Sequence, residues 1–238
     1  MSSVRNYKYS DQYKDKFDIG GELQKITTKN AAQRYFLKAI ESTEYDYVFG
    51  IGPCGTGKSL LAIYSAIKGL QEGRYKRIVF VRANVFVKDE MDIGAIPGTL
   101  EDKYAPHFAP MLDNLRELGI TKAYVANLIE ADLLELLPVQ WTRGRSFNDT
   151  IVILDEAQNC TPSQLITVVS RLGKNSKLIV IGDPDQIDRN MNDGEQSGLQ
   201  FAASRLEKVS SVYIQYFTRA DIVRNKNLSE VITILQAN

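Results

Sequence analysis

Short apolar runs alternate with longer segments of helical periodicity along most of the chain. The run Arg77–Arg82 (RIVFVR) has no alternation of polar and apolar residues, which is typical of a strand buried on both faces of a parallel sheet. Further strands are predicted at Tyr47–Ile51, Leu134–Val139, Thr150–Leu154, Lys177–Ile181 and Ser211–Gln215. Helices are predicted at Thr28–Ser42, Gly57–Gln71, Ser163–Arg171, Gly198–Lys208 and Asn227–Ala237, and one more between Leu100 and Leu118. This alternation predicts an α/β fold with a parallel, doubly wound sheet.

Two segments stand apart from this alternation. Residues 1–25 are polar and rich in tyrosine and lysine, so we expect an N-terminal arm before a single domain at 26–238. The irregular stretch Ala83–Gly98 is longer than most loops of compact domains, which indicates a functional or mobile loop.

Composition narrows the class of protein. The 238 residues include 29 Lys and Arg against 29 Asp and Glu, so a nucleic-acid site would have to be a local patch rather than the whole surface. No apolar stretch approaches the roughly 20 residues of a transmembrane helix, and we expect no membrane partner. Two cysteines, Cys54 and Cys160, provide no disulfide framework, which favours a cytoplasmic protein. The sequence has one histidine, His107, which disfavours a histidine-rich metal site or a catalytic triad that uses histidine.

The clearest chemical signal is GPCGTGKS at residues 52–59, which matches the phosphate-loop (Walker A) pattern G-x-x-x-x-G-K-[ST] between a strand and a helix. Glycines let backbone N–H groups curl around an anion, and the helix start adds partial positive charge. The candidate nucleotide-binding residues are Gly52, Pro53, Cys54, Gly55, Thr56, Gly57, Lys58 and Ser59. Lys58 would bind the β- and γ-phosphates of ATP and Ser59 would bind Mg²⁺, while Cys54 is interpreted as a spacer. The alternative is a glycine-rich turn without a ligand.

Two further strands end in polar residues. Asp155 and Glu156 follow an apolar strand (Walker B), where Asp155 would hold Mg²⁺ and Glu156 would act as the general base. An acidic pair could instead favour the start of a helix. Another strand ends in GDPDQ, whose Gln186 could contact the γ-phosphate or the attacking water. Alone, that segment is only a turn signal.

With these motifs the chain resembles the PhoH family of ATPases and, more distantly, the first motor domain of superfamily-one helicases. The resemblance covers residues 28–235. It rests on the phosphate loop, on IGAIPGTLEDKYAPHFAPMLDNL at 93–115, TRGRSFNDTIVILDEAQNCT at 142–161, GDPDQID at 182–188, SGLQFA at 197–202 and FTRADIVRN at 217–225. It implies a three-layer, RecA-like phosphate-loop domain that hydrolyses ATP, forms rings, with a hexamer suggested, and is linked in some members to RNA.

The resemblance also suggests roles for individual residues. Gln33 is similar to the glutamine of the helicase Q motif, which reads adenine, and would otherwise be a solvated helix residue. Arg224 matches the arginine of the family's D-V-V-R-H signature and is the candidate arginine finger, with Arg219 as the alternative; Asn225 replaces the companion histidine. A chain of this length has one motor domain, so we expect a neighbouring subunit to complete the site. Arg224 could instead cap local acidic residues such as Asp221.

Three arginines are candidates for contacting a nucleic-acid backbone or the bound phosphates: Arg82, Arg143 and Arg145. They could equally be solvated surface residues. The leading interpretation is Mg²⁺-dependent ATP hydrolysis linked to unwinding or remodelling of RNA or single-stranded nucleic acid. A nucleotide-dependent switch or assembly factor without nucleic acid is the main alternative. A small-molecule kinase is disfavoured, because the DEAQ and GDPDQ strand ends favour water as the acceptor.

Overall fold

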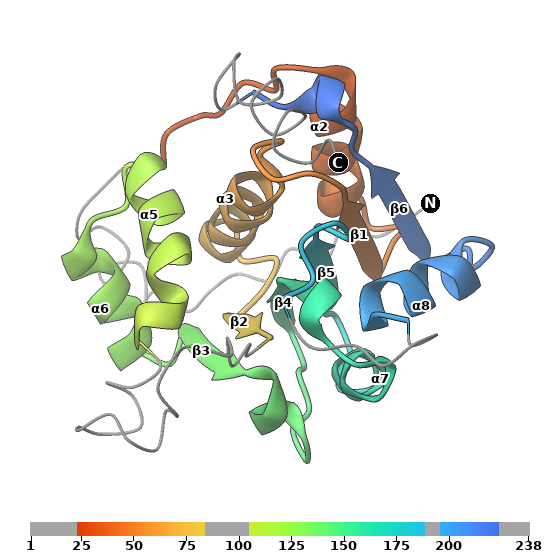
Figure 1. Ribbon diagram of the computed structural model, residues 1–238. Coiled ribbons are helices and arrows are strands. Elements are labelled where there is room, and N and C mark those ends of the chain that lie inside the picture. The colour runs from red at the N-terminus through yellow and green to blue at the C-terminus, as the bar shows by residue number, and fades with distance from the viewer. Residues whose placement is uncertain (1–22, 84–104, 189–195, 224–238) are drawn as a thin grey trace, which may run out of the picture.

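The computed structural model describes residues 23–83, 105–188 and 196–223, and its centre is a six-stranded sheet (Figure 1). The strands are β1 (Tyr47–Ile51), β2 (Arg77–Arg82), β3 (Leu134–Pro138), β4 (Thr150–Asp155), β5 (Lys177–Gly182) and β6 (Val212–Tyr216). Their order is β3-β2-β4-β5-β1-β6, and every adjacent pair is parallel. The predicted parallel α/β sheet is therefore confirmed.

Helices cover both faces of the sheet and complete three layers. One face carries α2 (Ala31–Glu41), α3 (Lys58–Gln71), α5 (Ala109–Glu117) and α6 (Lys122–Glu130), and the other carries α7 (Pro162–Val169) and α8 (Gly198–Leu206). Short 3₁₀ helices are η3 (Ala105–Phe108), η4 (Val139–Thr142), η5 (Ala157–Asn159) and η6 (Arg219–Asp221).

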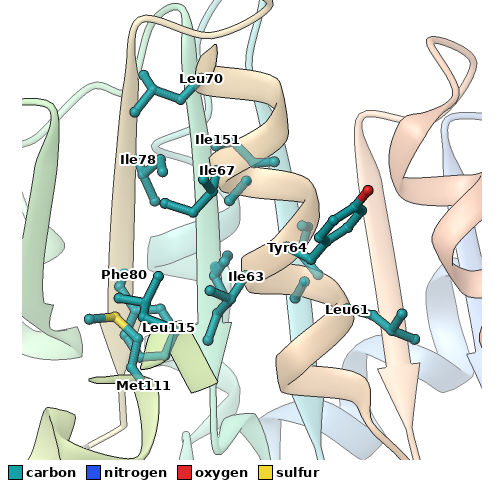
Figure 2. Close-up of a cluster of buried hydrophobic side chains, with 14 of the residues drawn as sticks. Leu61, Ile63, Tyr64, Ile67, Leu70, Ile78, Phe80, Met111, Leu115 and Ile151 are labelled. Atoms are coloured by element: carbon teal, nitrogen blue, oxygen red, sulfur yellow. The ribbon is translucent and has the colours of Figure 1, made fainter. Parts of the chain in front are cut away.

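The core follows from the period of two along each strand. In β2, Ile78 and Phe80 face the layer that contains α3, while Val79 and Val81 face the α7 and α8 layer. Figure 2 shows the first of these clusters, in which α3 packs against the central strands. Because both faces are covered, the central strands carry apolar residues on both faces between their ends, as the sequence pattern indicated.

One described helix, α6, was absent from the sequence-based prediction. Thr121 caps it by accepting a hydrogen bond from the backbone of Tyr124, and Tyr124, Val125 and Leu128 are buried at helical spacing. The helix is only nine residues long and has few polar residues, so its sequence does not show a clear helical periodicity. The predicted helix Asn227–Ala237 and most of the predicted long loop, residues 84–98, lie outside the described residues.

The end of the predicted N-terminal arm contacts the domain. Leu23 packs against the core, and the backbone nitrogen of Gln24 donates a 3.1 Å hydrogen bond to the Leu118 carbonyl oxygen. Residues 1–22 lie outside the described part of the chain, so the boundary at residue 25 stays a prediction. Within the described ranges, no helix has the length and apolar character that crossing a membrane requires.

Candidate functional site

The three polar strand ends predicted to bind nucleotide lie together on the side of the sheet where the strands have their carboxyl ends. Strand β5 sits between β1 and β4, with Ile51 opposite Gly182 in the β1–β5 register. At this edge the backbone nitrogen of Cys54 donates a 3.1 Å hydrogen bond to Oδ2 of Asp183. The phosphate loop is thereby fastened to the end of β5, and ligands of open α/β sheets bind at such carboxyl ends.

Two glycines of the phosphate loop are required by its shape. Gly57 has a φ of +85° at the start of α3, and a Cβ there would lie 2.8 Å from Nε2 of Gln33. A Cβ on Gly52 would overlap the backbone carbonyl oxygen of Phe217. The loop therefore passes close to both α2 and the segment after β6, which explains these two positions of the motif.

Lys58 brings a buried cation into the loop. Its Nζ donates to the carbonyl oxygens of Gly52 at 2.6 Å and Pro53 at 2.7 Å, and the residue is 7% exposed. Burial lowers the pKa of its ammonium group. Among the described residues, no carboxylate lies within ion-pair distance of this Nζ. A buried cation whose hydrogen bonds go to neutral oxygens fits the binding of an anionic phosphate.

Asp155 is a buried carboxyl at the end of β4. Burial raises its pKa to about 6, with a smaller contribution from the neighbouring charge of Glu156. Ser59 lies half-buried in the first turn of α3. A buried acid whose negative charge is costly, together with a hydroxyl beside the loop, fits Mg²⁺, which typically takes one or two carboxylates and completes its shell with phosphate and water. In the described ranges no cluster of three or more His, Cys, Asp or Glu residues could hold a metal alone.

Glu156 follows Asp155 with a left-handed backbone, at a φ of +54°. Its Oε1 lies 3.4 Å from Nη2 of Arg82, and its Oε2 accepts a 2.7 Å hydrogen bond from Nε2 of Gln158. Arg82 also donates through Nη1 to the carbonyl oxygen of His107 at 2.6 Å. The structure thus places Arg82, a predicted nucleic-acid or phosphate contact, beside the predicted general base.

Gln158 contacts the candidate site, although the sequence analysis assigned it no role. It is fully buried, and its amide bridges Glu156 to the turn after β5. Gln186, in that turn, is exposed, and its backbone oxygen accepts from Gln158 at 3.0 Å. The sequence signal for Gln158 was an amide side chain two residues after Glu156.

Gln33 supports the phosphate loop from α2. It is 4% exposed, its Nε2 donates to the Thr56 carbonyl oxygen at 2.9 Å, and its Oε1 accepts from the Lys29 backbone at 2.7 Å. The alternative of a solvated helix residue is therefore wrong. Its predicted contact with adenine stays a prediction.

The other candidate arginines differ in setting. Arg143 is exposed, whereas Nη2 of Arg145 donates to both carboxylate oxygens of Glu135, at 2.7 and 2.9 Å. Arg219 is exposed in η6, and Arg224 lies outside the described residues. The backbone nitrogen of Val223, directly before Arg224, donates to the carbonyl oxygen of Gly55 at 2.9 Å.

Comparison with known proteins places this arrangement in a family. The family model described as PhoH-like protein matches residues 25–236. The chain belongs to the PhoH-like protein family. It is 34% identical to the PhoH-like protein of Bacillus subtilis over 224 residues, which are 94% of this chain and 68% of that protein. It is 38% identical to Protein PhoH of Escherichia coli K12, over 84% of this chain and 55% of that one.

A further relative is also longer than this PhoH-like chain. The PhoH-like protein of Mycobacterium tuberculosis H37Rv is 37% identical over 87% of this chain and 57% of its own length. The PhoH-like chain thus spans from 55% to 68% of the lengths of these relatives.

A solved structure supports the fold. The large terminase from a thermophilic bacteriophage matches with a TM-score of 0.55 at 12% identity, over 90% of this chain and 51% of that chain. The predicted RecA-like fold is confirmed. With its family and its phosphate loop, the PhoH-like chain is a nucleotide-binding domain of the NTPase class.

Proposed function

We propose that this PhoH-like domain hydrolyses ATP in a Mg²⁺-dependent reaction. The observation that carries the proposal is the hydrogen-bonded junction of β1, β5 and β4 at their carboxyl ends. That junction brings a buried cation, Lys58, to the same sheet edge as a buried acid, Asp155, and a half-buried carboxylate, Glu156. Phosphoryl transfer needs these three kinds of group in one place.

Each group has a distinct task in binding. Lys58 would turn from the loop carbonyl oxygens to the β- and γ-phosphates, while the loop amides surround the phosphate oxygens. Asp155 and Ser59 would hold Mg²⁺, directly or through water. When bound, the ion neutralises negative charge on the β- and γ-phosphates.

Glu156 would serve as the general base. Its carboxylate accepts a proton from water as the water oxygen forms a bond to the γ-phosphorus. The bond between that phosphorus and the β–γ bridging oxygen breaks, which leaves ADP and inorganic phosphate. Gln186, exposed in the turn after β5, would contact the γ-phosphate or the attacking water.

We further propose that the domain couples ATP hydrolysis to unwinding or remodelling of RNA or single-stranded nucleic acid. We also propose that it works as a ring, with a hexamer suggested by the family resemblance. Support comes from η4, directly after β3, where Trp141 is 43% exposed and the next-but-one residue, Arg143, is also exposed. An exposed indole and an exposed guanidinium two residues apart suit stacking on a base and contact with a phosphate. Of the predicted basic residues, Arg143 is therefore the one we assign to nucleic acid.

The test is phosphate release from ATP and Mg²⁺ by the purified chain, alone and with RNA, single-stranded DNA or duplex DNA. We expect release that single-stranded nucleic acid stimulates, and loss of release in Lys58→Ala. Release without stimulation or binding at low salt would favour the alternative, a nucleotide-dependent switch or assembly factor. Undiminished release in Lys58→Ala would contradict the phosphate-loop assignment.

A further inference from the structure

The side-chain amide of Gln158 connects two strand ends of the candidate site. Its Nε2 donates to Oε2 of Glu156 at 2.7 Å and to the backbone oxygen of Gln186 at 3.0 Å. Its Oε1 accepts from the backbone nitrogen of Asp183 at 3.1 Å. Both amide hydrogens and the carbonyl oxygen therefore have partners, and the side chain is 0% exposed.

The end of β5 is shaped to admit this amide. A Cβ on Gly182 would lie 2.5 Å from Oε1 of Gln158 and 3.1 Å from its backbone nitrogen. Gly182 lies within the regular strand β5, so a turn conformation does not explain the glycine. The space it leaves is filled by the Gln158 amide and by Cδ2 of Leu199, which would lie 2.8 Å from that Cβ, so a side chain at position 182 would displace the amide or the leucine.

Glu156 needs such a support because packing alone does not fix it. Its side chain is 35% exposed, and its backbone is in the left-handed region. The shortest described contact of its carboxylate is the one to Gln158, since the opposite oxygen lies 3.4 Å from Arg82. A side chain with this much exposure can rotate toward solvent when its short hydrogen bond is removed.

We propose that Gln158 is a positioning residue that sets the Glu156 carboxylate against the Asp183–Gln186 turn. The inference rests on the proposed function, in which Glu156 activates water and Gln186 faces the γ-phosphate. One amide hydrogen-bonds both the Glu156 carboxylate and the backbone of Gln186, so it determines the distance between the base and the turn that carries Gln186. A misplacement of about 1 Å at such a site can cost on the order of 100-fold in rate.

The test compares Gln158→Met and Gln158→Glu with wild type. Methionine keeps the length of the side chain and loses all three hydrogen bonds. Glutamate retains an acceptor for the Asp183 amide but loses the donors to Glu156 and Gln186. We expect kcat for phosphate release to fall about 10- to 100-fold in both, with the Kd for ATP changed by less than about threefold.

Hydrogen exchange provides a readout that does not depend on activity. The Asp183 amide should exchange faster in Gln158→Met and stay protected in Gln158→Glu, because only the latter keeps its acceptor. The matched control is Gln164→Ala, which removes a glutamine that hydrogen-bonds the backbone of Thr161 at the start of α7. It should leave kcat, Kd and Asp183 exchange unchanged.

A double-variant comparison separates positioning from general damage. In the Glu156→Gln background, the second change Gln158→Met should cost no further turnover in a sensitive single-turnover assay. Additive losses, unchanged kcat in both single variants, or Kd and kcat that worsen together would overturn the positioning role. Near-normal turnover in Glu156→Gln alone would instead remove the proposed base, and the inference with it.

Discussion

Cys54 and Asp183 are 129 residues apart in sequence, yet the backbone nitrogen of Cys54 donates a 3.1 Å hydrogen bond to Oδ2 of Asp183. The other carboxylate oxygen of Asp183 accepts from the backbone of Asp185 at 3.1 Å. One buried carboxylate thus holds the phosphate loop and shapes the turn after β5. Its burial raises its pKa, and the two amide bonds oppose that shift.

Asp183→Ala should loosen the phosphate loop. Each hydrogen bond to a charged acceptor contributes about 1.5–3 kcal/mol, so the loss of two should cost about 3–6 kcal/mol. The chain should therefore unfold at least several degrees lower in a thermal melt, and the Cys54 amide should exchange faster. The control is Asp185→Ala, which removes an exposed carboxylate and leaves its backbone donor in place. Equal melting temperatures and exchange rates in the two variants would contradict the role given to Asp183.

The fold was predictable because strands that are buried on both faces have continuous apolar sequences. Apolar runs such as Ile151–Leu154 admit few interpretations other than a strand covered on both faces. The phosphate loop was predictable because its fixed positions have local causes: the glycines allow the backbone to curl, and Lys58 and Ser59 supply a cation and a hydroxyl. Helix α6 was missed because it is only nine residues long and apolar over most of its length, so its sequence shows no clear alternation of apolar and polar faces.

The contacts around Glu156 could not be predicted from sequence. Arg82 ends a strand and was assigned to phosphate or nucleic acid because a guanidinium at a strand end is compatible with either. Its actual contact with Glu156 follows from the β2–β4 register, which pairs Arg82 with Asp155. Gln158 turns back toward Glu156 through η5, and no spacing rule marks that turn.

Lys177 should make the free energy of unfolding of the domain depend on pH in the alkaline range. Its buried Nζ donates to carbonyl oxygens that follow α2, at 2.7 Å to Ser42 and 2.5 Å to Tyr45. Burial lowers its pKa from 10.5 to about 8. Between these two values the unfolded chain binds more protons than the folded one, so the free energy of unfolding rises with pH.

Urea unfolding at pH 7, 8, 9 and 10 measures this effect. The stability of wild type relative to Lys177→Met should be constant below about pH 8 and increase by about 1–3 kcal/mol by pH 10. Lys174→Met, which alters an exposed lysine, should show no such trend. A difference between wild type and Lys177→Met that stays constant through pH 10 would be inconsistent with a neutralised buried lysine.

Arg143→Glu should reduce the stimulation of phosphate release by RNA and leave the basal rate unchanged. The change removes about one phosphate contact, so the dependence of RNA affinity on salt should also become less steep. Lys208→Glu is the control, because Lys208 is exposed shortly before β6, at the opposite edge of the sheet. Equal effects of the two variants would place the nucleic acid elsewhere.

Arg224 is proposed to act as an arginine finger in the site of a neighbouring subunit, a contribution typically worth about 10³–10⁵-fold in rate. Mixing the inactive variants Glu156→Gln and Arg224→Ala should then restore phosphate release in mixed rings. Val223 contacts Gly55 of its own phosphate loop, so the experiment also tests action within one subunit. Mixtures no more active than the separate variants, or a fully active monomer, would refute a shared site.

The central claim is that Glu156 activates water at a site where other residues bind the nucleotide. The most direct measurement follows ATP binding and phosphate release side by side in wild type, Glu156→Gln and the control Glu72→Gln, whose side chain is exposed after α3. The account predicts that Glu156→Gln binds ATP within about threefold of wild type and releases phosphate on the order of 10²–10⁴-fold more slowly, while Glu72→Gln matches wild type. Phosphate release by Glu156→Gln at a rate close to that of wild type would contradict the account.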